Sequence, residues 1–168
     1  IDARKGLELF QLRDHLPLAK EVLQEVLGTP QENEVLKRLT RRRRRLVNER
    51  VRVVNNLQAD LQAVCPGLLE ITSEASSQWF LNFLLSADTL AQLARLRKAT
   101  LLKIPAVGRK YASRIEDWQK RAHFGAEVEW VSEMIQEDAQ RCLDLAEMIK
   151  TLQTKIKQVA QDSKIAKM

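Results

Sequence analysis

The sequence predicts an all-α fold, a long antiparallel helical hairpin (coiled coil) with a small helical head. Two long segments, 31–64 and 126–162, contain neither Gly nor Pro and carry apolar residues at three- and four-residue steps. Between them lies a shorter block, 68–124, that is interrupted by Pro105 and Gly108. No run of residues alternates apolar and polar positions convincingly, so we expect no β-strand.

Residues 1–28 predict an N-terminal segment of two short helices. Apolar residues recur over 2–12 and again over 16–27, and Gly28 fits the stop of the second helix. Because the chain begins with Ile1 rather than Met, we expect it to be a segment of a longer protein.

Residues 29–65 predict a long basic helix. Thr29, Pro30 and Glu32 form a capping box with proline at the first helical position. The helix would be roughly 50 Å long at 1.5 Å per residue. Its apolar seam consists of Leu36, Leu39, Leu46, Val53, Leu57 and Val64. The sequence Cys65-Pro66-Gly67 ends it.

Residues 66–125 predict the head, with three or four short helices, and residues 126–168 predict the long return helix. A head that joins two long helices at one end makes them antiparallel. The return helix has an unbroken series of apolar positions, which are Cys142, Leu145, Ile149, Leu152, Ile156 and Val159.

Charge is concentrated in the first long helix. The chain has 28 basic and 22 acidic residues, a net charge of +6. Residues 31–64 hold nine basic and four acidic residues, and therefore five of the six net charges. Four arginines share a narrow arc opposite the leucine seam, and we call them the arginine arc: Arg38, Arg41, Arg45 and Arg52. Such a stripe suits the tracking of a phosphate backbone, whereas the alternative is a solvated helix face. The candidate nucleic-acid-binding residues of this helix are Arg38, Arg41, Arg42, Arg45, Arg52 and Asn55.

Two arginines, Arg43 and Arg50, fall on the apolar seam itself. The only carboxylate on the seam of the return helix is Asp138, which an antiparallel hairpin would place level with position 50. We therefore predict a buried or half-buried ion pair between Arg50 and Asp138, within one chain or across a dimer interface.

Residues 101–112 resemble a helix-hairpin-helix element, in which a tight turn and the start of the next helix face a DNA phosphate. Gly108, Arg109 and Lys110 are the candidate contacts. The familiar form has glycine in two places, and Ala106 occupies the first of them. The alternative is an ordinary helix-helix turn.

Catalytic and metal-binding patterns are absent from the sequence. It has no phosphate-binding Walker loop, HExxH or GxSxG motif, and His15 and His123 have no suitable nucleophile nearby. Cys65 and Cys142 lack the spacing of a zinc site or a disulfide scaffold, which favours a reducing compartment. The sequence shows no signal-peptide pattern. It also has no apolar run of about 20 residues, the length that a membrane span requires.

The order of features resembles the central region of DEDD (RuvC-like) insertion-sequence transposases, which are related to the pilin-gene invertases. The matching residues are Asp2-Ala3-Arg4, the run Arg41 to Val47, then Glu49, Arg50, Arg52, Asn55 and Leu57, and later Ile149 to Ile156. This resemblance covers nearly the whole chain.

The resemblance implies a non-catalytic central fragment of a DNA transposase or site-specific recombinase, providing dimerisation and nucleic-acid contacts. The parent protein would have a RuvC-like nuclease domain with four acidic residues that bind Mg²⁺, and a later domain with a catalytic serine. Asp2 would be a remnant of that acidic site, and its three partners would precede Ile1. The fragment itself would be inert, hold no metal or cofactor, and contact DNA and in some cases structured RNA. A homodimer through the coiled coil and a location in the bacterial cytoplasm, away from the membrane, are also implied. The alternative is a purely structural coiled-coil module for protein–protein interaction.

Overall fold

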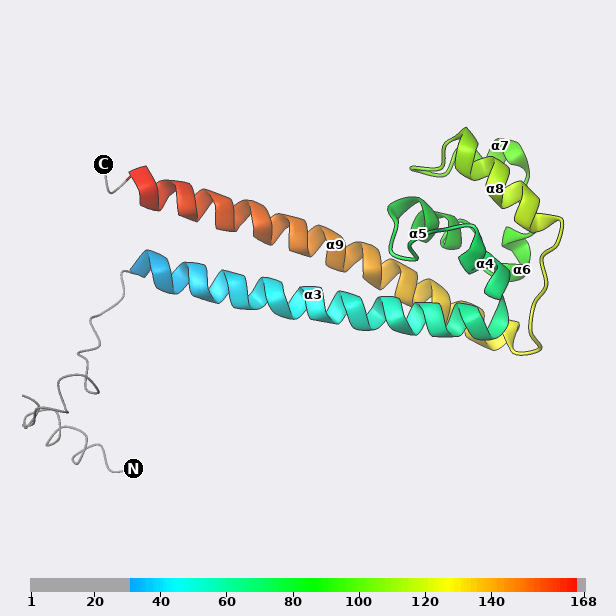
Figure 1. The fold of residues 1–168 in the computed structure, drawn as a ribbon, viewed down its shortest axis with the longest axis horizontal. Helices are drawn as coiled ribbons and strands as arrows, with labels where there is room; N and C mark the ends of the chain where they lie inside the picture. Colours follow the sequence, from blue (N-terminus) through cyan, green and yellow to red (C-terminus); the bar gives the residue numbers. More distant parts are fainter. Residues whose placement is uncertain (1–30, 166–168) are drawn as a thin grey trace, which may run out of the picture. The chain divides into compact units, whose positions relative to one another are not determined.

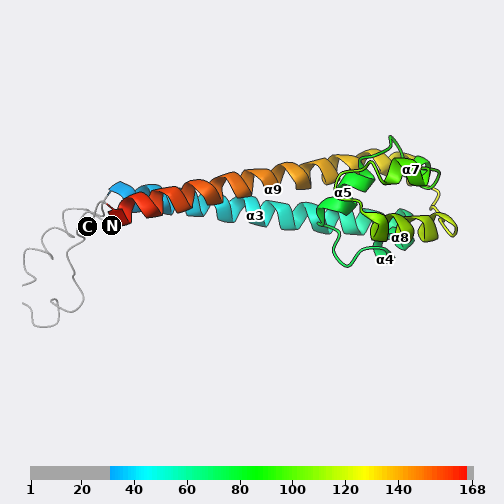
Figure 2. The same ribbon diagram turned by 90° about the horizontal axis from the view of Figure 1, so that it is seen from above.

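The computed structural model describes residues 31–165, and residues 35–165 belong to one compact unit. Within that unit the predicted all-α hairpin is confirmed. Two long helices, α3 (Gln31–Val64) and α9 (Val128–Ile165), lie side by side and run antiparallel (Figures 1 and 2). No residue in the range 31–165 lies in a β-strand. Several predicted features lie outside the described residues. They are the helices predicted over 2–12 and 16–27, the capping residues Thr29 and Pro30, and also Asp2 and His15.

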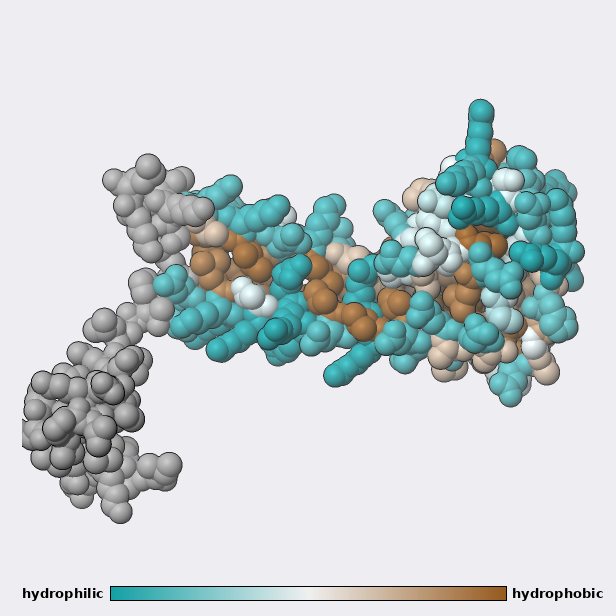
Figure 3. All heavy atoms as spheres, in the orientation of Figure 1, coloured by the Kyte–Doolittle hydropathy of each residue, from teal (hydrophilic) through white to brown (hydrophobic). Residues whose placement is uncertain are grey.

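The seams of α3 and α9 are buried most completely near the head. The fully buried positions there include Leu57 and Leu61 of α3 and Ile135, Ala139 and Cys142 of α9. Towards the open end, burial becomes thinner, and a small separate cluster holds the helices together. Its buried members are Leu46, Leu145 and Leu152, packed with the half-buried Leu39, Val53 and Ile149. Two helices alone cannot enclose a core, so part of this seam stays accessible, and Figure 3 shows an apolar strip between hydrophilic borders.

Five short helices form the described head. They are α4 (Pro66–Glu70), α5 (Gln78–Leu84), α6 (Leu90–Leu93), α7 (Lys98–Leu101) and α8 (Arg109–Gln119). Helices α5 and α6 pack against α9, and α7 packs against α8. Aromatic side chains fill the centre of the head, where the rings of Phe83 and Trp118 meet edge to face at 6.0 Å.

The chain closes the hairpin where the return loop meets the end of α3. The backbone N–H of Gly125 donates a hydrogen bond to the carbonyl of Val64 over 2.8 Å. A Cβ at position 125 would lie 3.4 Å from the carbonyl oxygen of Ala63, so the glycine permits a close backbone approach. This contact places the start of α9 beside the end of α3. None of the helices within residues 31–165 is both long enough and apolar enough to cross a membrane.

Candidate nucleic-acid interface

All four side chains of the arginine arc (Arg38, Arg41, Arg45, Arg52) are exposed on α3. The leucine seam lies on another face of α3 and packs against α9. Successive residues of an α-helix are about 100° apart around its axis, so the arc and the seam fall on different faces. The helical spacing spreads the four guanidiniums over about 21 Å of axis, at 1.5 Å per residue. The structure therefore presents the arc to solvent rather than packing it against the second helix.

A nearby carboxylate that would neutralise the arc is held elsewhere. Glu49 lies four residues after Arg45 and three before Arg52, a spacing that allows ion pairs within one helix. In the structure, however, Glu49 accepts hydrogen bonds from Arg141 of α9, with Nε at 3.1 Å and Nη2 also in contact. The same contact raises the pKa of Arg141 above its usual value. Among the described residues, the arginine arc has no ion-pair partner.

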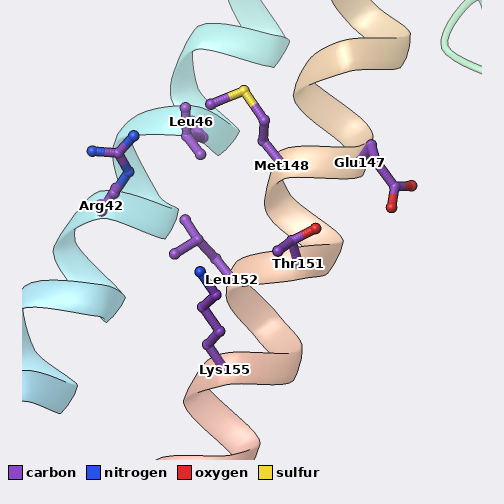
Figure 4. A pocket seen from close by; sticks show the side chains of 7 residues that line it. All are labelled: Arg42, Leu46, Glu147, Met148, Thr151, Leu152 and Lys155. Atoms are coloured by element: carbon purple, nitrogen blue, oxygen red, sulfur yellow. The ribbon is translucent and has the colours of Figure 1, made fainter.

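The remaining candidates of α3 divide between two environments. Asn55 is exposed, three residues beyond the end of the arc, whereas Arg43 is half-buried on the seam. Arg42 borders a groove of about 250 Å³ at the open end of the hairpin, which we call the open-end groove (Figure 4). Its lining residues are Arg42, Leu46, Glu147, Met148, Thr151, Leu152 and Lys155.

The turn between α7 and α8 has the geometry of a tight hairpin. The N–H of Val107 donates to the carbonyl of Ile104 over 3.1 Å, and Ala106 has a φ of 66°. Proline at the second position and a positive φ at the third define a type II turn, which favours glycine at the third. The structure thus places Ala106 in the left-handed region, at the position where the related motif has glycine. Asn82 of α5 fixes the turn by donating to the carbonyl of Pro105 over 2.9 Å.

Gly108, Arg109 and Lys110 are all exposed at the start of α8. The carbonyl of Gly108 accepts hydrogen bonds from the next turn, but the N–H groups of Arg109 and Lys110 have no acceptor among the described residues. A Cβ at Gly108 would meet nothing within 4 Å, so the space beside the turn is open. The apolar side chains of Ile104 and Val107 anchor the turn in the core. The turn accordingly offers backbone donors and two cationic side chains on one surface.

The prediction of an ion pair between Arg50 and Asp138 within the chain is wrong. Arg50 donates from Nη2 to the carbonyl of Ser76 over 3.2 Å, and its buried Nε has no partner. Asp138 is half-buried, and its pKa is raised by burial and then by the charges of Asp60 and Glu137. The neighbouring pair Glu49–Arg141 joins the helices instead.

The error lies in the rotation of the two helices about their own axes, and not in their alignment along those axes. Glu49 is one residue from Arg50, and Arg141 is three residues from Asp138. The predicted alignment of the two antiparallel helices along their axes was therefore nearly right. Arg50 and Asp138 both lie close enough to the buried Cys142 to affect its pKa, which burial raises, Arg50 lowers and Asp138 raises. The loop before α5 supplies the carbonyl that Arg50 uses, and sequence periodicity contains no information about that loop. The sequence did not single out Arg141, which pairs with Glu49, or Lys155, which lines the open-end groove, because both lie beside the seam.

The described residues contain no group of three or more His, Cys, Asp or Glu side chains that could hold a metal ion. Asp2, the predicted remnant of an acidic site, lies outside them. No protein-family model, no curated protein and no solved structure matches the chain.

Proposed function

We propose that this chain is the central, non-catalytic segment of a DNA transposase of the DEDD type, and that it binds nucleic acid through the phosphate backbone. The observation that carries the proposal is the arginine arc (Arg38, Arg41, Arg45, Arg52), four exposed guanidiniums in one stripe without a carboxylate partner in the described part of the chain. The assignment to a transposase rests on the sequence resemblance alone. The structure supports only the nucleic-acid contact.

The arc fits phosphates better than bases. A guanidinium binds a phosphate through two parallel hydrogen bonds, and four of them along a helix match a repeating backbone. Reading a base sequence requires side chains at defined places in a groove, and arginines on an exposed convex helix provide contacts along the strand instead. The proposed binding is therefore largely independent of sequence.

The turn before α8 supports the same function as a second contact. Arg109 and Lys110 add positive charge beside the open space at Gly108. Backbone N–H groups at the start of a helix favour a phosphate, because the helix dipole also places positive charge there.

The test is the affinity of the full chain for fluorescent duplexes and single strands of unrelated sequence at one salt concentration. Changing Arg38, Arg41, Arg45 and Arg52 together to Gln keeps helix propensity and removes four charges. We expect affinity to fall roughly a hundredfold or more at low salt, and to fall alike for every sequence. A matched control changes the exposed Lys150 and Lys157 of α9 to Gln, and we expect this pair to have a much smaller effect per charge.

Two outcomes would contradict the proposal. If the arc variant bound as tightly as the unchanged chain, the stripe would be a solvated face and the chain a structural module. If the lysine control lost as much affinity per charge as the arc variant, binding would follow net charge alone and the arc would have no special role.

A further inference from the structure

The first turns of α9 carry exposed apolar side chains that the proposed function does not use. Trp130 is 81% exposed and Met134 54%, and they are the two most exposed large apolar side chains on the described part of α9. Four residues separate them, so they are neighbours on one face of the helix. Residues four apart form the ridges by which helices pack against each other. The other two tryptophans, Trp79 and Trp118, are buried.

Trp130 lies on the side of α9 that faces away from the core of the hairpin. The side chains that α9 buries near the head include Ile135, Ala139 and Cys142. Ala139 follows Trp130 by nine residues, which is half a turn of rotation about the helix axis. The outer face of such a helix normally carries polar residues. The packing of the hairpin therefore does not explain a tryptophan at this position.

Carboxylates border the two apolar side chains on both sides. Glu127 and Glu133 lie three residues before and after Trp130, about 60° to either side of it around the helix. Glu137 lies three residues after Met134. All three glutamates are exposed, and none forms an ion pair within the described part of the chain. We call this surface the acidic ridge: Trp130, Met134, Glu127, Glu133 and Glu137.

The helix dipole explains only part of this negative charge. Residues 126–140 contain five acidic and no basic residues, although the whole chain has a net charge of +6. Carboxylates at the start of a helix are stabilised by the dipole, which accounts for Glu127 and Glu129. The effect falls off within the first turn, and Glu133 and Glu137 lie beyond it. The negative charge thus follows the ridge and does not stop at the end of the helix.

We propose that the acidic ridge binds a basic amphipathic helix of a partner protein, a contact that is separate from the nucleic-acid surface and does not depend on it. An apolar stripe of the partner would pack on Trp130 and Met134, as the side chains of one helix fill the grooves of another. Lysines or arginines on both sides of that stripe would face the glutamates, which makes the two surfaces complementary in charge. A cation of the partner that lies over the exposed indole ring adds a cation–π attraction.

A helix suits this surface better than an extended peptide. The backbone groups within α9 already bond to each other, so the helix offers no edge to which a strand could add. The partner must therefore bind through side chains alone. Trp130 supplies a large anchor of the type enriched at the centres of protein interfaces, and the flexible Met134 adapts to the shape of the apolar stripe.

Nucleic acids and anionic membranes fit the acidic ridge poorly. The phosphates of either would be repelled by the glutamates on both sides of Trp130. Two acidic ridges placed face to face would repel each other for the same reason. Charge thus selects a cationic partner for this part of a chain that is otherwise basic.

The probe is a synthetic peptide of leucine and lysine, about 18 residues or five helical turns long, with leucines at three- and four-residue steps. One control peptide has glutamate in place of lysine, and another has the same leucines and lysines without the periodicity. None contains tryptophan, and Trp130 is the one exposed tryptophan of the chain, so tryptophan fluorescence reports on the ridge. We expect the periodic lysine peptide to shift the emission of the full chain to shorter wavelength, and neither control to do so.

The anisotropy of a dye-labelled lysine peptide gives the dissociation constant for each variant. Trp130→Ala should raise this constant about tenfold or more, as removal of a central aromatic anchor does. Val51→Ala is the matched control, because Val51 is a 54% exposed apolar residue of α3 outside the acidic ridge, and it should change the constant little. Equal effects of the two substitutions would overturn the proposal.

Charge variants test the border of the ridge. Glu133→Gln with Glu137→Gln should raise the dissociation constant about three- to tenfold, because two exposed ion pairs are lost. The matched control, Glu147→Gln with Asp162→Asn, removes the same charge from exposed positions farther along α9 and should change it little. Changing Glu127, Glu133 and Glu137 together to Lys should make the chain bind the glutamate peptide through Trp130 instead. Such a gain of binding cannot come from unfolding, and circular dichroism checks that the helices persist.

Several results would refute the acidic ridge as a site for a basic helix. These are an emission that stays unshifted up to about 1 mM lysine peptide, an equal shift by the peptide without periodicity, and an equal shift by the glutamate peptide. A shift on raising the concentration of the chain alone would assign the ridge to a second copy. A shift with a DNA duplex or anionic vesicles but not with the lysine peptide would assign it to phosphates. Changing the four arginines of the arginine arc to Gln should not weaken peptide binding, so the failure of either proposal is distinguishable from the failure of the other.

Discussion

Replacing Ala106 by glycine should stabilise the protein, although glycine usually destabilises folded chains. Ala106 has a φ of 66° in the turn before α8, and an L-residue in the left-handed region costs about 1–2 kcal/mol. The methyl group is exposed, so its removal loses no packing. Glycine makes the unfolded chain more flexible, which costs about 0.4–1 kcal/mol. The net gain in the free energy of unfolding is about 0.5–1 kcal/mol, or about 1–4 °C in melting temperature.

The assay is urea or thermal unfolding of the full chain followed by circular dichroism. Ala112→Gly is the matched control, because Ala112 lies inside α8 and is fully buried. It should lose about 1 kcal/mol of helix propensity and about 0.8 kcal/mol of methyl burial. Opposite signs for the two substitutions would support the turn geometry. If Ala106→Gly destabilised the chain as Ala112→Gly does, the left-handed turn would be refuted, and with it the resemblance of this element to a helix-hairpin-helix.

Three further predictions follow from burial. Leu145→Ala should lower the free energy of unfolding by about 2–5 kcal/mol, because Leu145 is fully buried in the small cluster at the open end. Chemical denaturation measures this loss, and a loss below about 1 kcal/mol would contradict the packing of that cluster. Burial raises the pKa of Asp138 in the folded chain, so folding favours the protonated carboxyl group. The free energy of unfolding therefore falls as pH rises from the unfolded pKa near 3.8 through the higher folded pKa. Asp138→Asn should therefore be more stable than the unchanged chain at pH 7 and equal to it near pH 2, whereas a constant difference between the two unfolding curves would refute the shift. Burial raises the pKa of both Cys65 and Cys142, so a thiol reagent should modify them only as fast as the chain opens, and rapid modification of the folded protein would contradict their burial.

Apolar periodicity was sufficient to predict the hairpin. The absence of Gly and Pro over 31–64 matches the bounds of α3, and α9 begins two residues after the predicted segment does and ends at Ile165. Within a long helix, each side chain's face follows from its number, and so the exposure of the arginine arc was predictable too.

Contacts that depend on loops were not predictable in this way. The partner of Arg50 is the Ser76 carbonyl, and no pattern in the sequence places that loop beside α3. The choice of Glu49 by Arg141 depends on the rotation of both helices about their axes, which a seam of three- and four-residue steps defines only to within about one position. The positive φ of Ala106 was hidden because alanine gives no sign of a left-handed turn, whereas glycine would have.

The salt dependence of nucleic-acid affinity tests the central claim most directly. Binding through phosphates releases counterions, so the logarithm of the association constant should fall linearly with the logarithm of salt concentration. Each phosphate contact contributes about 0.7–0.9 to that slope, and changing Arg38, Arg41, Arg45 and Arg52 to Gln should flatten it by about 3. An affinity that ignores salt, or a slope that the four substitutions leave unchanged, would contradict the assignment of the arginine arc to a phosphate backbone.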